Sequence, residues 1–186
     1  MLWGFEGKEG ENVYLDAYKL FMSNGILFNH ESEVRGTEFV TRKISRSVAK
    51  ICHGSKEPYI SGNLSAVSDR RFARVYVEGI WIMFKHDYPD DFVLGTGESH
   101  TVREFAEAAF KEIDMDIEWI GSGMNEVGLS EGMTRVKVSR EFFRPLESDN
   151  YRADYRKAKE KLGWKPTTMF KDLVDIMVRK DIERYL

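Results

Sequence analysis

The sequence predicts an α/β fold, because short apolar runs alternate with amphipathic segments of helical length along the chain. The runs at residues 26–28 and 92–94 are wholly apolar and are followed by polar or glycine-containing turns, which is typical of buried strands. Residues 39–52 and 101–113 carry apolar side chains at helical spacing. We therefore expect strands and helices to alternate throughout.

The first half of the chain has clear helix and turn signals. Residues 12–22 have apolar side chains at helical spacing, and Asn24-Gly25 ends that helix. The helix predicted at 37–52 ends at a glycine, Gly54, as many helices do. The other predicted elements of this half are a polar loop at 29–32, a turn at Gly36, a strand at 58–60 and a helix at 73–86.

In the second half, Thr101-Val-Arg-Glu104 has the sequence of a capping box and opens a helix that runs to about residue 113. The remaining predicted elements are a strand at 117–120, a glycine-rich loop at 121–134, a strand at 135–138 and closing helices at 154–162 and 168–185. No internal repeat, linker or low-complexity tract interrupts the sequence, so residues 1–186 are predicted to form a single unit.

Composition limits the classes of function. The chain has 186 residues, of which 42% are hydrophobic and 32% are charged, as in an ordinary folded domain. Its 28 basic and 31 acidic residues leave a net charge of -3, so there is no basic field to collect nucleic acid. Cys52 is the only cysteine, which excludes an internal disulfide and favours a reducing, cytoplasmic compartment. We expect neither a membrane helix nor a secretory leader, because no apolar run approaches roughly 20 residues.

Gly4, Gly7 and Gly10 have the spacing of a loop whose backbone N–H groups bind a pyrophosphate. Such a loop needs a buried strand before it and an acidic residue about 20 positions later. Only three residues precede Gly4, and no acidic residue ends a second strand at that distance. We favour a coincidental match in a flexible N-terminus over a nucleotide-binding loop.

The four histidines are not spaced as metal ligands, so no metal site is predicted. His30 differs from the others because it follows an apolar strand inside a polar loop, where open α/β sheets bind ligands. A hydrogen bond that stabilises the loop is the favoured alternative for this side chain.

Basic residues recur along the helix predicted at 37–52 and just before it, and they could meet a phosphate. They are Arg35, Arg42, Lys43, Arg46 and Lys50. A solvated helix face is the favoured alternative.

Near the C-terminus, Arg144 and Glu147 follow two aromatic residues and could hold a diphosphate and a sugar hydroxyl, with a surface ion pair as an equal alternative. Arg135 is predicted to be solvated. Tyr18 and Lys19 are adjacent, whereas a proton-transfer pair on a helix needs a separation of four residues, so they predict no such pair.

Asn-Gly-Ile-Leu-Phe-Asn-His-Glu-Ser at residues 24–32 closely resembles the segment after the catalytic helix of GDP-mannose 4,6-dehydratases, which are extended short-chain dehydrogenase relatives. The resemblance covers residues 12–186. Its further motifs include Phe-Val-Thr-Arg-Lys at 39–43, Gly-Asn-Leu at 62–64, Val-Arg-Glu-Phe at 102–105, Phe-Arg-Pro at 143–145 and Lys-Glu-Lys-Leu-Gly-Trp-Lys-Pro at 159–166. It implies a partial doubly wound, Rossmann-like sheet with the smaller C-terminal substrate-binding subdomain of that family.

The family converts GDP-mannose to a 4-keto-6-deoxy product with tightly held NADP, so the resemblance implies both ligands. The Tyr and Lys of a Tyr-x-x-x-Lys motif, with a Thr and a Glu, carry its proton transfers. Aligned back from Asn29 and His30 without gaps, that Tyr would fall before Met1 and that Lys at Gly4. The resemblance therefore implies the C-terminal half of such an enzyme, without catalytic residues or the glycine loop.

The residues that the resemblance carries over as substrate-binding are Asn29, Lys43, Arg144 and Glu147. Those that it carries over as approaching NADP are His30 and Arg35. The family loop after residue 32 usually holds two arginines and favours tetramers, whereas Val34 leaves only Arg35 here. We expect a homo-oligomer but not the family's tetramer.

A second departure lies in Ser-Asp-Arg-Arg-Phe at residues 68–72, where the family reads Arg-Asp-Trp-Gly-His and places its arginine near the diphosphate. Ser68 cannot supply that charge. Arg70 or Arg71 is the candidate to reach the same phosphate from a shifted position.

Two functions remain open. The first is an enzyme half that binds a GDP-sugar and works with a separate N-terminal half. The second is a non-catalytic module that binds GDP-sugars, and a complete dehydratase ranks last. A lone half should expose a sheet edge and apolar faces, which favour dimerisation or aggregation.

Overall fold

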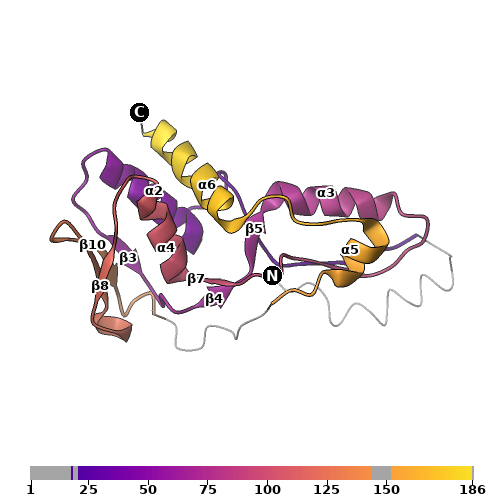
Figure 1. The fold of residues 1–186 in the computed structure, drawn as a ribbon, viewed down its shortest axis with the longest axis horizontal. Helices are drawn as coiled ribbons and strands as arrows, with labels where there is room; N and C mark the ends of the chain where they lie inside the picture. Colours follow the sequence, from indigo (N-terminus) through magenta and orange to yellow (C-terminus); the bar gives the residue numbers. More distant parts are fainter. Residues whose placement is uncertain (1–17, 19–20, 144–151, 186) are drawn as a thin grey trace.

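The computed structural model describes residue 18, residues 21–143 and residues 152–185. It is an α/β structure in which the described elements gather around two hydrophobic cores. We call the part around the smaller core the strand-pair lobe, and the part around the larger core the helical lobe. Figure 1 shows the two lobes side by side with β5 between them.

The strand-pair lobe is built on β1 (Gly25–Leu27) and β6 (Phe92–Leu94), which pair in parallel with Ile26 opposite Val93. Helices α3 (Ala73–Phe84) and α5 (Arg156–Leu162) pack against this pair. A Cβ atom on Gly79 would lie 2.8 Å from Leu94 and 2.9 Å from Trp164, so the close approach of α3 requires a glycine here.

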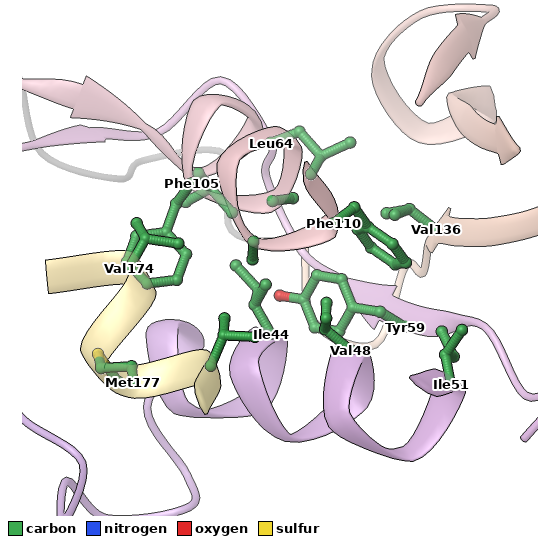
Figure 2. Close-up of a cluster of buried hydrophobic side chains, with 14 of the residues drawn as sticks. Ile44, Val48, Ile51, Tyr59, Leu64, Phe105, Phe110, Val136, Val174 and Met177 are labelled. Carbon is green, nitrogen blue, oxygen red and sulfur yellow. The ribbon is translucent and has the colours of Figure 1, made fainter. Parts of the chain in front are cut away.

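The helical lobe contains α2 (Val40–Cys52), α4 (Val102–Lys111) and α6 (Phe170–Arg184), which pack on one another. The predicted capping box of α4 is confirmed, since Thr101 Oγ1 accepts from the Glu104 N–H at 3.0 Å and the Glu104 carboxylate accepts from the Thr101 N–H at 2.7 Å. Figure 2 shows side chains from these helices meeting in the larger core. Its fully buried members include Ile44, Val48, Phe105, Phe110 and Met177.

A four-stranded sheet closes the helical lobe. Its strands, in spatial order, are β3 (Tyr59–Ser61), β10 (Met133–Val138), β9 (Val127–Ser130) and β8 (Glu118–Ile120). Strand β10 is parallel to β3 and antiparallel to β9. The predicted loop at 121–134 is therefore wrong in part, because it contains β9 and a short 3-10 turn, Gly123–Asn125. The two residues between β9 and β10, Glu131 and Gly132, both have positive φ, which permits the tight hairpin.

Two short strand pairs join the lobes. Strand β2 (Asn29–Glu31) is parallel to β5 (Arg70–Phe72), and β4 (Val67–Ser68) is antiparallel to β7 (His100–Thr101). The predicted loop at 29–32 is thus wrong, because backbone pairing with a distant segment makes most of it a strand. Phe72 packs against both cores, which places the β2–β5 pair at the junction of the lobes.

Most other predicted elements are confirmed within a few residues, including the strands at 26–28, 58–60, 92–94, 117–120 and 135–138. Most of the predicted helix at 12–22, and Gly4, Gly7 and Gly10, lie outside the described residues. Within the described part of the chain, no helix combines the length and the apolar character needed to cross a membrane.

Candidate functional site

A cavity of about 210 Å³ lies at the junction of the two lobes. Two residues that line this cavity are hydrogen-bonded to each other, since Asn29 Nδ2 donates to Ser68 Oγ at 2.5 Å. Asn29 pairs with Arg70 in the parallel β2–β5 register, so both side chains leave the sheet on the same face. The cavity is lined by Asn29, Val40, Asn63, Ala66, Val67, Ser68, Arg70 and Val102.

Arg70 brings a cation to this cavity. Its side chain is largely buried, and Nη1 donates to the carbonyl oxygen of His100 at 3.2 Å. That bond fixes the guanidinium between β5 and β7. The arrangement can bind an anionic or hydroxyl-rich ligand, because amide, hydroxyl and guanidinium groups converge on one hollow.

His30 and Arg71 occupy the opposite face of the β2–β5 pair. The His30 ring lies edge-on to Tyr76 with ring centroids 6.0 Å apart, and its Nδ1 is 3.3 Å from the carbonyl oxygen of Phe28. This contact matches the local hydrogen bond anticipated for His30 as an alternative to ligand binding. Because the ring remains exposed, it is also accessible to a ligand.

Arg71 is buried, and its Nη2 lies 3.3 Å from Glu98 Oε2. Its Nε and Nη1 atoms have no hydrogen-bond partner among the described residues. Burial raises the pKa of the nearby Tyr76 phenol, and the charge of Asp69 adds to this rise. Tyr76 is therefore a poor substitute for a proton-transfer tyrosine, which needs a lowered pKa.

Arg35 lies beside His30. Its Nη1 donates to the His30 carbonyl oxygen at 2.8 Å, and its guanidinium lies 3.6 Å from the ring centroid of Phe39. Arg35 Nε is 3.4 Å from Glu31 Oε2. The structure thus brings together the two residues that were expected to approach a nucleotide cofactor.

Lys43 lines a different hollow, of about 300 Å³, beside α2. Its Nζ lies 5.0 Å from the ring centroid of Phe142. Arg46 and Lys50 also line this hollow, whose lining contains no carboxylate. A phosphate could therefore be held here by three cations.

The expectation of a solvated basic helix face is wrong for Arg42. Its guanidinium is buried, with Nη2 2.9 Å from Asp181 Oδ1 and Nη1 donating to the Glu33 carbonyl oxygen. Arg135, which was also expected to be solvated, is only 5% exposed. Both arginines point inward because α2 and β10 pack against other elements on those faces.

Arg144 and Glu147 lie outside the described residues, so their predicted role is untested. The chain leading to them approaches the cavity, because a Cβ atom on Gly62 would lie 2.3 Å from the Phe142 carbonyl oxygen. Gly62 is next to Asn63, which lines the cavity. Sequence reasoning did not identify Asn63 as a site residue, although it lies in the Gly-Asn-Leu motif.

All four histidines contact other groups of the protein. Besides His30, His53 Nε2 is 3.1 Å from the Ile182 carbonyl oxygen, His86 Nδ1 is 2.9 Å from that of Tyr88, and His100 stacks on Phe170. No group of three or more His, Cys, Asp or Glu side chains in the described ranges could hold a metal ion.

The buried carboxyl of Glu31, on β2 next to Asn29 and His30, should make the stability of the fold depend on pH. Burial raises the pKa of this carboxyl, and the hydrogen bond from Thr41 and the charge of Arg35 only partly oppose the rise. A raised pKa in the folded state adds stability below the unfolded pKa, and this contribution is lost as pH rises through the folded pKa. Glu31→Gln can still accept the hydrogen bond from Thr41 but has no carboxyl to ionise. Its stability should therefore lack the decrease that Glu31 causes as pH rises.

Urea unfolding of the wild type and Glu31→Gln between about pH 4 and about pH 8 measures this effect. The advantage of the wild type over the variant should shrink as pH rises. Glu38→Gln is the matched control, because it makes the same change at an exposed side chain. A constant difference between wild type and Glu31→Gln would contradict the assignment.

The chain is similar to known proteins both in sequence and in fold. The family model described as GDP-mannose 4,6 dehydratase matches residues 11–177. GDP-mannose 4,6 dehydratases of Drosophila melanogaster and Homo sapiens are 49% and 51% identical over 172 residues, which are 91% of this chain and 44% and 46% of those proteins. The chain therefore spans about half the length of these curated relatives.

Solved structures share the fold. RMD from Pseudomonas aeruginosa, complexed with NADPH, aligns with a TM-score of 0.74 and 14% identity, over 92% of this chain and 52% of that one. UDP-glucose 4-epimerase from Thermotoga maritima, with UDP-glucose, aligns with a TM-score of 0.73 and 15% identity, over 98% and 52% of the two chains. At these identities, the likeness concerns the fold, and this chain reproduces about half of it.

Proposed function

The chain belongs to the GDP-mannose 4,6-dehydratase family, and on that premise we propose that it supplies the GDP-sugar-binding half of such an enzyme. In this proposal, activity needs the half of the family's fold that this chain does not match. The observation that carries the proposal is the cavity at the lobe junction, where Asn29 and Arg70 converge. Asn29 is one of the residues that the family resemblance carries over as substrate-binding.

Arg70 replaces the cation that the family places at position 68. Ser68 lines the same cavity as Arg70 but is hydrogen-bonded to Asn29, so it acts as a neutral partner. Arg71 is a weaker candidate, because its guanidinium lies on the opposite sheet face beside Glu98. We therefore assign the diphosphate contact to Arg70.

Lys43 is proposed to contact the nucleotide end of the substrate from the second hollow. Arg46 and Lys50 give this hollow its positive charge, which would attract phosphate. Arg144 and Glu147 are proposed to complete the grip on the nucleotide sugar. The approach of Phe142 to Gly62 supports this role, because it brings the preceding chain close to Asn63.

His30 and Arg35 fit a nucleotide cofactor, because Arg35 Nη1 donates to the His30 carbonyl oxygen and His30 is exposed. We propose that they contact NADP, whose nicotinamide, when bound, accepts hydride from the sugar and returns it. Since Asn29 and His30 leave β2 on opposite faces, these residues keep substrate and cofactor contacts apart. Proton transfer would be performed by residues of the other half.

Arg70→Ala tests the substrate assignment. Loss of a charge-assisted hydrogen bond costs about 1.5–3 kcal/mol, so calorimetric titration with GDP-mannose should show affinity reduced about 10- to 100-fold. Arg74→Ala is the control, because Arg74 is exposed on α3 and pairs only with Glu78 in the described structure. Unchanged affinity in a folded Arg70→Ala variant would overturn the assignment.

A non-catalytic GDP-sugar-binding module is the second candidate. The observation in its favour is that Asn29, Ser68 and Arg70 of this chain already bring amide, hydroxyl and guanidinium groups to the cavity at the lobe junction. GDP-mannose binding that never leads to turnover, even when the family's other half is supplied, would favour this module over the enzyme half.

A further inference from the structure

The first observation is a side-chain hydrogen bond between the two short strand pairs that join the lobes. Ser68 lies on β4, which pairs with β7, whereas Asn29 lies on β2, which pairs with β5. Asn29 Nδ2 donates to Ser68 Oγ at 2.5 Å, and both residues line the cavity at the lobe junction. This bond therefore ties one strand pair to the other at the wall of the cavity.

The second observation fixes the direction of this hydrogen bond. The Ser68 hydroxyl donates to the carbonyl oxygen of Asp69, 3.5 Å away. A hydroxyl has one proton to donate, so its lone pairs are left to accept from the Asn29 amide. The buried Asp69 carboxylate accepts from the N–H groups of Thr96 and Gly97, which holds the chain at residue 69 in place. The orientation of the Asn29 amide is thus set from an anchored part of the fold.

The same bond limits what Asn29 can offer to a ligand. A side-chain amide has two N–H donors and a carbonyl oxygen that accepts. Ser68 uses one N–H, so one donor and the acceptor remain on this exposed side chain. A sugar hydroxyl both donates and accepts, and it can therefore satisfy the two together. A phosphate oxygen only accepts, and it would face the amide oxygen without a proton between them.

The cavity consequently has two chemically different parts. Arg70, opposite Asn29 in the β2–β5 pair, supplies a guanidinium that suits a negatively charged group. The pair formed by Asn29 and Ser68 is uncharged. A basic side chain at position 68 could not accept from the Asn29 amide, because lysine and arginine have no acceptor atom. Serine at this position therefore determines which groups Asn29 presents, in addition to the local charge.

We infer that Ser68 is a positioning residue, which holds the Asn29 amide so that Asn29 recognises a hydroxyl of the sugar and not the diphosphate. The inference rests on the proposed function, because the sugar is that of the GDP-sugar assigned to this cavity. Ser68 acts through the orientation of Asn29, so its effect requires no contact of its own with the ligand.

Titration with two related ligands tests this role. GDP-mannose and GDP differ by the mannosyl group, so losing a contact to a sugar hydroxyl affects only the first. Ser68→Ala should weaken GDP-mannose binding about 2- to 10-fold, as expected for one neutral hydrogen bond, and leave GDP binding unchanged. Ser68→Thr keeps the hydroxyl and should restore GDP-mannose binding. Ser122→Ala is the control, because Ser122 is exposed and its side chain does not cap the 3-10 turn that follows it.

A double-mutant comparison separates positioning from a general structural role. In an Asn29→Ala background, Ser68→Ala should cause no further loss of GDP-mannose affinity, because no amide remains to be oriented. Solvent exchange of the Asn29 side-chain amide, followed by NMR without ligand, should rise about 2- to 10-fold in Ser68→Ala. A further loss in the Asn29→Ala background, equal weakening of GDP and GDP-mannose binding, or unchanged exchange would each overturn the inference.

The ligand-free measurement also distinguishes failure of this inference from failure of the proposed function. If wild type binds neither GDP-mannose nor GDP, the proposed function fails and the sugar contact fails with it. Faster amide exchange in Ser68→Ala would then still show that Ser68 positions Asn29. If wild type binds both ligands and Ser68→Ala changes neither affinity, the proposed function stands and the inference fails.

Discussion

Replacing Asp181 with alanine is expected to lower the free energy of unfolding by about 3–5 kcal/mol. The Asp181 carboxylate on α6 is 1% exposed and accepts from Ser45 Oγ at 2.6 Å. Its other oxygen lies 2.9 Å from Arg42 Nη2. Truncation would leave the Arg42 guanidinium buried without its carboxylate, which is more costly than losing an exposed ion pair.

Urea unfolding followed by circular dichroism measures this loss. Glu183→Ala is the control, since Glu183 lies on the same helix and its ion pair with Lys180 is solvent-exposed. That variant should leave the free energy of unfolding nearly unchanged, because exposed ion pairs contribute little to stability. A loss below about 1 kcal/mol in Asp181→Ala would mean that Arg42 finds water once its partner is removed, contrary to its burial here.

The helices were predictable because their signals are local. The capping box at Thr101 and the glycine after α2 are read directly from neighbouring residues. Even α3, whose β-branched residues have low helix propensity, was identified by its length and apolar content. Its burial against Leu94 and Trp164 explains why tertiary packing overrides that propensity.

The β2–β5 pair could not be predicted in the same way, because its strands are short and polar. Asn29 pairs with Arg70, and His30 with Arg71, across about 40 intervening residues. Nothing in the local pattern of either segment shows that register. The same pairing decides which arginine faces the cavity, so the sequence left Arg70 and Arg71 as equal candidates.

Buried charges were the other source of error. Arg42 and Arg135 were predicted to be solvated, because arginine is mostly exposed in proteins. Their burial depends on partners contributed by distant elements, such as Asp181 for Arg42. By contrast, Asn29 and Ser68, which the family resemblance relates to the substrate, are hydrogen-bonded to each other, and their role in binding stays a prediction.

Asp69 carries the second large prediction, because this residue holds the segment after β6 against β5. Its carboxylate is 1% exposed and accepts from the Thr96 N–H at 2.9 Å, the Thr96 hydroxyl at 2.7 Å and the Gly97 N–H at 3.0 Å. Asp69→Ala would leave the Thr96 and Gly97 N–H groups without an acceptor, whereas the Thr96 hydroxyl could still donate to the Glu98 carbonyl oxygen at 3.1 Å. Each unpaired donor costs about 1–3 kcal/mol, so we expect a loss of at least about 2 kcal/mol in the free energy of unfolding.

The same change should also weaken the proposed binding of GDP-mannose, because Asp69 lies between Ser68 and Arg70 and fixes both strands that carry them. Unfolding in urea gives the stability loss, and calorimetric titration under conditions where the variant is folded gives the affinity. Asp69→Asn keeps one side-chain acceptor and should fall between wild type and Asp69→Ala in both measurements. Asp87→Ala, at an exposed aspartate, should match wild type. A stable Asp69→Ala variant with normal affinity would show that the Thr96–Gly97 donors are satisfied by water and do not depend on Asp69.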